Sequence, residues 1–175
     1  QCRRAKTRRR RRYAKSFKRE AKSFGDVFTC DHVHMKDKCG SAGVGNFPDA
    51  FNMYDIATGC KYSIPASGLE TFEVFSALNH VKGKDRIKNV FCDNYSSYKR
   101  AIKELRATYE PSQPGVHHSN AITERQNQDI IYGTRVLLCA GGLPACFWTY
   151  ATPYYCHIEN IMQDDDPVIQ PSQAT

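Results

Sequence analysis

The stretch Cys92–Ile131, CDNYSSYKRAIKELRATYEPSQPGVHHSNAITERQNQDII, decides the fold that we predict for this chain. It follows an apolar run, Ile87 to Phe91, which is typical of a buried β-strand. Asp93 therefore lies in the turn at the carboxyl end of that strand, and Glu124 lies in the first turns of an amphipathic helix. Because ligand sites of α/β sheets gather at the carboxyl ends of strands, the stretch predicts a polar site there.

A third acid lies upstream, in the strand-like run DVFTCDHVHM of residues 26–35. Alternation along this strand places one set of side chains on one face (Val27, Thr29, Asp31, Val33 and Met35) and the other set on the opposite face (Phe28, Cys30, His32 and His34). Asp31 is an acid among apolar neighbours, which is costly unless it is paired, hydrogen-bonded or bound to a metal. Asp26 follows a glycine and is interpreted as a turn residue. Two strands and a helix could therefore bring three acids to a pair of hard cations.

The other segments alternate between strand and helix patterns. Strands are predicted over 53–56, 62–64 and 107–109, and helices from a Ser67 cap to Gly83, over 95–105, from Ser119 or Asn120 to Gly141, and over 143–161. The last helix is expected to face the core through Phe147, Trp148 and Tyr150. The pattern is that of an α/β domain.

Residues 24–160 resemble the catalytic core of retroviral and retrotransposon integrases, a branch of the ribonuclease-H-like enzymes that uses two aspartates and a glutamate. The matching motifs are Asp31, Asp93-Asn94, Pro114-Gly115, Ser119-Asn120, Thr123 to Asn127, Ala140 to Pro144, and Phe147-Trp148. The resemblance implies an α/β fold with a ribonuclease-H-like mixed five-stranded sheet flanked by helices.

The resemblance also implies a polynucleotidyl transferase that cleaves DNA ends and transfers them into target DNA. Its catalytic residues and metal ligands would be Asp31, Asp93 and Glu124, which would hold two Mg²⁺ or Mn²⁺ ions, with Asp31 bridging both. The partners would be DNA, as element ends and as target, and further copies of the chain.

DNA contacts are expected from the helix that carries Glu124. His118, Ser119 and Asn120 occupy positions at which integrases have polar residues that touch DNA. Glu124, Asn127 and Gln128 share one helical stripe, so the two amides could face DNA. Arg125 points about 100° away from Glu124, toward the DNA backbone phosphate.

Two features depart from the family pattern. Asp93 and Glu124 are 31 positions apart, which is shorter than the usual integrase spacing, and His118-Ser119-Asn120-Ala121 replaces the common Gln-Thr-Asn-Gly. Two other functions therefore stay open. One is a ribonuclease-H-like nuclease or a cut-and-paste transposase, and the other is a decayed or domesticated fragment that only binds nucleic acid.

Charge is distributed unevenly along the chain. The formal net charge is +7, but residues 1–22 hold twelve Lys and Arg against one acid, so the remainder carries a net charge of −4. We interpret residues 1–23 as a basic arm that binds DNA phosphate or acts as a nuclear-import signal, with a solvated linker as the alternative. Its densest part is Arg8, Arg9, Arg10, Arg11 and Arg12. Residues 161–175 are predicted to be a polar C-terminal linker.

The eight cysteines are irregularly spaced and contain no C-x-x-C pair, and the chain shows no secretory signal. Reduced thiols in the nucleus or cytoplasm are expected. Cys2 resembles the last ligand of the zinc-binding domain that precedes many integrase cores, so the arm would be the tail of such a domain and the chain a fragment. Cys30, His32, His34 and Cys39 are a weaker zinc candidate, and we expect no bound zinc. No apolar run approaches the ~20 residues of a membrane span.

Overall fold

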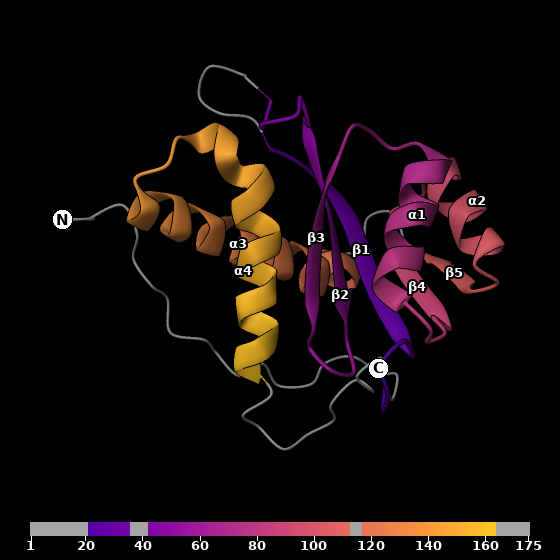
Figure 1. The fold of residues 1–175 in the computed structure, drawn as a ribbon. Helices are drawn as coiled ribbons and strands as arrows, with labels where there is room; N and C mark the ends of the chain where they lie inside the picture. Colours follow the sequence, from indigo (N-terminus) through magenta and orange to yellow (C-terminus); the bar gives the residue numbers. More distant parts are fainter. Residues whose placement is uncertain (1–20, 36–41, 113–116, 164–175) are drawn as a thin grey trace.

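The computed structural model describes residues 21–35, 42–112 and 117–163 (Figure 1). Its centre is a five-stranded sheet of order β3-β2-β1-β4-β5, formed by β1 (Val27–His34), β2 (Asp49–Asp55), β3 (Lys61–Ala66), β4 (Asn89–Cys92) and β5 (Thr108–Pro111). The strands β1, β2 and β3 form an antiparallel meander, whereas β4 runs parallel to β1 and β5 runs parallel to β4. The mixed five-stranded sheet predicted from the sequence is confirmed.

Four helices flank this sheet (Figure 1). They are α1 (Thr71–Lys82), α2 (Ser96–Glu104), α3 (His117–Gly141) and α4 (Trp148–Gln163), and a short 3₁₀ turn (Ala145–Phe147) precedes α4. The helices α1 and α2 lie on one face of the sheet, and α3 and α4 lie on the other. Within the described segments, no helix combines the length and the apolar composition that a membrane crossing requires.

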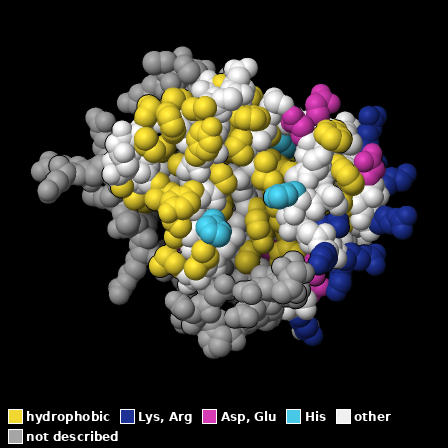
Figure 2. All heavy atoms as spheres, viewed as in Figure 1, with side chains coloured by type: hydrophobic (Ala, Val, Ile, Leu, Met, Phe, Trp, Pro, Cys, Tyr) yellow, Lys and Arg dark blue, Asp and Glu magenta, His cyan; other side chains and the backbone are white. Residues whose placement is uncertain are grey.

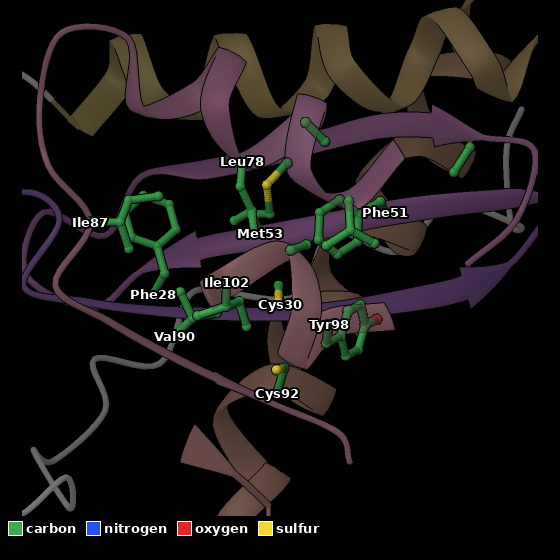
Figure 3. Packing of buried hydrophobic residues seen from close by; sticks show 14 residues of the cluster. Phe28, Cys30, Phe51, Met53, Leu78, Ile87, Val90, Cys92, Tyr98 and Ile102 are labelled. Carbon is green, nitrogen blue, oxygen red and sulfur yellow. The ribbon is translucent and has the colours of Figure 1, made fainter. Parts of the chain in front are cut away.

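The alternation predicted for β1 is confirmed by its contacts. Phe28 and Cys30 are almost fully buried in the main hydrophobic core, where they pack with Val90, Cys92 and Tyr98 beneath α1 and α2 (Figure 3). The opposite face of β1, which carries Asp31, therefore points toward α3. Because the parallel strand β4 buries Val90 and Cys92 in the same core, the residue after Cys92 emerges on the α3 side as well.

A buried lysine ties α3 and α4 to the edge of the sheet. Lys61, the first residue of β3, is 3% exposed, and its ammonium pairs with Asp129 of α3 and, at 3.3 Å, with Glu159 of α4. Its backbone N–H donates to the Asn160 amide oxygen at 2.8 Å. A buried charge of this kind is tolerated only when it is paired, so these contacts fix both helices relative to β3.

Two helix details differ from the prediction. The first helix begins at Thr71 with Glu70 as its N-cap, and the Ser67 hydroxyl donates instead to Glu73. In the last helix Trp148 is buried, as expected, but Tyr150 is 62% exposed. The helical repeat explains this difference, because residues two positions apart lie on nearly opposite sides of a helix.

Candidate active site

Two of the predicted acids lie on neighbouring parallel strands. Cys30 of β1 is paired with Cys92 of β4, and each cysteine is followed directly by an aspartate, Asp31 and Asp93. Because adjacent strands are about 4.8 Å apart, this register places the two half-buried carboxylates next to each other on the α3 side of the sheet. The Ser112 hydroxyl, just after β5, donates to Asp93 Oδ1 at 2.9 Å.

The electrostatics of Asp31 reflect this placement. The pKa of the Asp31 carboxyl is raised from 3.8 to about 6, first by burial and then by the negative charge of Asp93, with a smaller contribution from Glu124. Hydrogen bonds from the Asn127 side chain and the His32 backbone act in the opposite direction. The site therefore concentrates negative charge in a partly desolvated position, which a bound cation would relieve.

The third predicted acid lies farther out. Glu124 is exposed in the N-terminal part of α3 and acts on Asp31 through its charge. One turn later, Asn127 is 8% exposed and donates from Nδ2 to Asp31 Oδ2 at 2.9 Å. Within the described residues, no three His, Cys, Asp or Glu side chains are grouped closely enough to hold a metal ion. The structure thus brings Asp31 and Asp93 together and leaves Glu124 at the rim.

The residues expected to contact DNA have different positions. Arg125 and Gln128 are exposed on α3, whereas the Asn127 amide is turned inward, between Asp31 and Asn52, rather than toward the helix surface. His118, Ser119 and Asn120 belong to the first turn of α3, but their side chains lie outside the described part of the structure. The residues Arg8, Arg9, Arg10, Arg11 and Arg12 also lie outside the described part of the structure.

Sequence reasoning missed the polar residues that surround the acids. Asn52 and Ser63, which are 4% and 3% exposed, lie on β2 and β3 and face α3, and Ser112 reaches Asp93 from the end of β5. An available signal was the asparagine in the centre of an otherwise apolar strand, AFNMYD, because such a buried amide requires partners.

The zinc candidate set is separated by its contacts. His32 Nδ1 hydrogen-bonds to the Tyr98 hydroxyl at 2.7 Å, and burial lowers the pKa of His32 to about 4. His34 is paired with Asp49, and Cys30 lies in the core. Cys39, and Cys2 of the arm, lie outside the described residues. The described members of the set therefore have separate partners.

Comparison with known proteins places this geometry in context. No protein-family model matches the chain. Over 96 residues, 52% of the chain, it is 28% identical to the retrovirus-related Pol polyprotein from transposon TNT 1-94 of Nicotiana tabacum, and the match spans 7% of that polyprotein. Its fold is similar to that of a chain in the cryo-EM structure of the simian T-cell lymphotropic virus intasome in complex with PP2A regulatory subunit B56 gamma. The TM-score is 0.65 at 15% sequence identity, and the match covers 90% of this chain and 60% of that chain. The resemblance to integrase catalytic cores is confirmed.

The integrase-like fold is ribonuclease-H-like, as the sequence predicts. The resemblance implies divalent cations, and the residues present fit them in their chemistry. Asp31 and Asp93 offer adjacent hard oxygen donors, and the negative charge of Asp93 helps to raise the pKa of Asp31. Glu124 supplies a further carboxylate within electrostatic range.

The surface of the integrase-like domain is divided by character. Figure 2 shows hydrophobic side chains over α4 and β3, and Lys and Arg side chains along the edge formed by α1 and α2. A groove of about 500 Å³ between β3 and α1 is lined by apolar residues such as Phe51, Ile64 and Phe72 and includes none of the three acids. Its apolar walls do not suit a phosphate backbone.

Proposed function

We propose that this domain is the catalytic core of an integrase within a Pol-type polyprotein, which cleaves DNA ends and transfers them into target DNA. The observation that carries the proposal is the adjacency of Asp31 and Asp93 on neighbouring parallel strands, beneath the part of α3 that carries Glu124 and Asn127. The similarity to a retrovirus-related Pol polyprotein and the integrase-like fold support it. The proposed location is the nucleus or the cytoplasm.

The three carboxylates Asp31, Asp93 and Glu124 would hold two Mg²⁺ or Mn²⁺ ions. When bound, such ions activate a water or a 3′-hydroxyl and stabilise negative charge on the phosphate. The protein itself orients the donors, because Asn127 holds one oxygen of Asp31 and Ser112 holds one oxygen of Asp93. Pre-oriented donors of this kind reduce the reorganisation that the reaction requires.

A basic surface on α2, the helix that follows Asp93, supports DNA as the substrate. The helix α2 begins at Ser96, three residues after Asp93, and exposes Lys99, Arg100 and Lys103. We propose that DNA contacts the basic residues of α2, which lie on the edge rich in Lys and Arg (Figure 2), and that the basic arm and the exposed residues of α3 hold it as well.

The test is a strand-transfer assay with oligonucleotide substrates in Mg²⁺. Asp31→Asn, Asp93→Asn and Glu124→Gln preserve size but remove charge, and each is expected to abolish joining while leaving DNA binding by the arm intact. Asp26→Asn is the control, because its carboxylate serves a turn, pairing with Lys88 and capping backbone N–H groups, and this variant should retain activity.

The products of the assay separate the alternatives. Cleavage without joining would indicate a ribonuclease-H-like nuclease, and DNA binding without metal-dependent chemistry would indicate a decayed fragment. If Glu124→Gln keeps full Mg²⁺-dependent strand transfer, Glu124 is not the third ligand and the integrase proposal fails for this stretch.

A further inference from the structure

A row of polar side chains crosses three strands of the sheet on the side of α3. In the strand register, Asp31 of β1 lies opposite Asn52 of β2, and Asn52 lies opposite Ser63 of β3. Paired residues of neighbouring strands point to the same face of a sheet, so the three side chains form one line that runs toward Asp31. Each of Asn52 and Ser63 is less than 5% exposed, which makes an unpaired polar group at either position costly.

Continuous hydrogen bonds link this row to the helix above it. The Ser63 hydroxyl donates to Asn52 Oδ1 at 2.6 Å, and Asn52 Nδ2 donates to Asn127 Oδ1 at 2.9 Å. Asn127 Nδ2 then donates to Asp31 Oδ2 at 2.9 Å. We call these four residues the polar relay. It connects β3, β2, α3 and β1 through side chains alone.

The direction of the polar relay is fixed by its last member. An ionised carboxylate can only accept, so the Asn127 amide must present its NH₂ group to Asp31 and its oxygen to Asn52. Asn52 must therefore present its own NH₂ group to Asn127, which leaves its oxygen for the Ser63 hydroxyl. Each amide is thus held in one of its two flipped orientations by its hydrogen-bond partners on both sides.

We propose that Asn52 and Ser63 are positioning residues that act through Asn127 to hold the Asp31 carboxylate in its cation-binding orientation. This inference rests on the proposed function of Asp31 as a cation ligand. Neither residue is expected to touch a cation or DNA, because both are buried behind Asn127. Partners of metal ligands commonly affect metal affinity by about 10–100-fold, and a residue one step farther out is expected to act at the lower end of that range.

The test is the stabilisation of the whole chain by Mn²⁺ and Mg²⁺. The apparent dissociation constant of the cation, here called the midpoint, is obtained by fitting the increase in melting temperature across a cation titration. Ser63→Ala removes the first donor of the polar relay and should raise the midpoint concentration about tenfold. Ser63→Thr keeps a hydroxyl on a residue that suits a strand and should restore the midpoint. Asn52→Leu, of similar volume, should raise the midpoint at least as much as Ser63→Ala.

A matched control separates positioning from stability. The Thr29 hydroxyl is buried on the same face of β1, two residues before Asp31, and makes no hydrogen bond within the described residues. Thr29→Val should therefore leave the midpoint unchanged. If Ser63→Ala lowers the metal-free melting temperature but leaves the midpoint unchanged, the polar relay is only structural and the inference is overturned. If neither cation raises the melting temperature of the unmodified protein, the proposed function itself fails. In that case the Asp31→Asn variant and the unmodified protein will show the same absence of stabilisation by cations.

Discussion

The sharpest test of the site is the pH dependence of stability in a metal-free Asp31→Asn variant. The pKa of Asp31 is raised from 3.8 to about 6 by burial and by the charge of Asp93, so the folded state holds an ionised carboxylate at a cost. Since one pKa unit is worth about 1.4 kcal/mol, the difference corresponds to about 3 kcal/mol. Asparagine keeps the shape and can still accept from Asn127 but carries no charge.

The sign of the effect follows from proton linkage. Above pH 6, Asp31 is ionised in both the folded and unfolded states, so the folded state bears the whole cost. Below pH 3.8 the carboxyl is protonated in both states, and the cost disappears. The Asp31→Asn variant should therefore match the unmodified protein near pH 3.5. It should become more stable by up to about 3 kcal/mol as the pH rises through 6.

Urea unfolding in EDTA at pH values from 3.5 to 8 measures this difference directly. The variant and the unmodified protein share every other titrating group, so the comparison isolates the Asp31 carboxyl together with its interaction with Asp93. Asp26→Asn provides a control of opposite sign. The pKa of Asp26 is lowered to about 2 by Lys88 and by backbone N–H groups, so its contribution to stability is present above pH 3.8 and is lost as the pH falls through 2. A pH-independent difference for Asp31→Asn, or a variant that is less stable at pH 7, would refute the reasoning.

Three further outcomes are expected. Gly133→Ala should destabilise the domain by about 1–2 kcal/mol in urea unfolding. A Cβ there would lie 2.1 Å from the Tyr155 ring, and overpacking of this kind exceeds the ~1 kcal/mol gain in helix propensity. Gly68→Ala, whose added Cβ would have no neighbour within 4 Å, should be near neutral in the same assay. If about six positive charges of residues 1–22 contact phosphate, log K for DNA should fall with log salt at a slope near −5, and deletion of the arm should flatten it; an unchanged slope would make the arm a spacer. Elemental analysis of the purified protein should find no stoichiometric zinc, and one tightly held zinc per chain would contradict this.

The sheet of this domain could be predicted because its strands carry strong local signals. The alternation around Asp31 and the apolar run before Asp93 specify which face of each strand is buried, and the contacts of Phe28 and Cys92 agree. The ends of helices and strands were harder to predict from the sequence. The hydroxyl of Ser67 looked like a helix cap, but Glu73 accepts from it and from the Gly68 N–H, so the helix begins later.

The support around the acids could not be predicted, because it depends on contacts distant in sequence. Asn127 is 96 positions from Asp31 and 75 from Asn52, and helical periodicity alone suggested only that its amide lies on the stripe of Glu124. Gly133 is a further example, because its low helix propensity alone gives no reason for a glycine within α3. The structure explains this glycine, because the Tyr155 ring of α4 occupies the space that a side chain at position 133 would fill.

The site combines two kinds of construction. Asp31 and Asp93 are held by strand register, which is rigid because a one-residue slip of either strand would turn its acid toward the hydrophobic core. Glu124 is carried by a helix, and the side chains of Asn127 and Asp129 anchor that helix downstream of it. The sheet therefore sets the spacing of two acids, whereas the distance to the third depends on the turn of α3 before Asn127. The deviation of the sequence from the integrase pattern at residues 118–121 falls at the start of the same helix, before Glu124, whereas Asp31 and Asp93 match the pattern. Variation among related domains should consequently change the reach of Glu124 more readily than the Asp31–Asp93 pair.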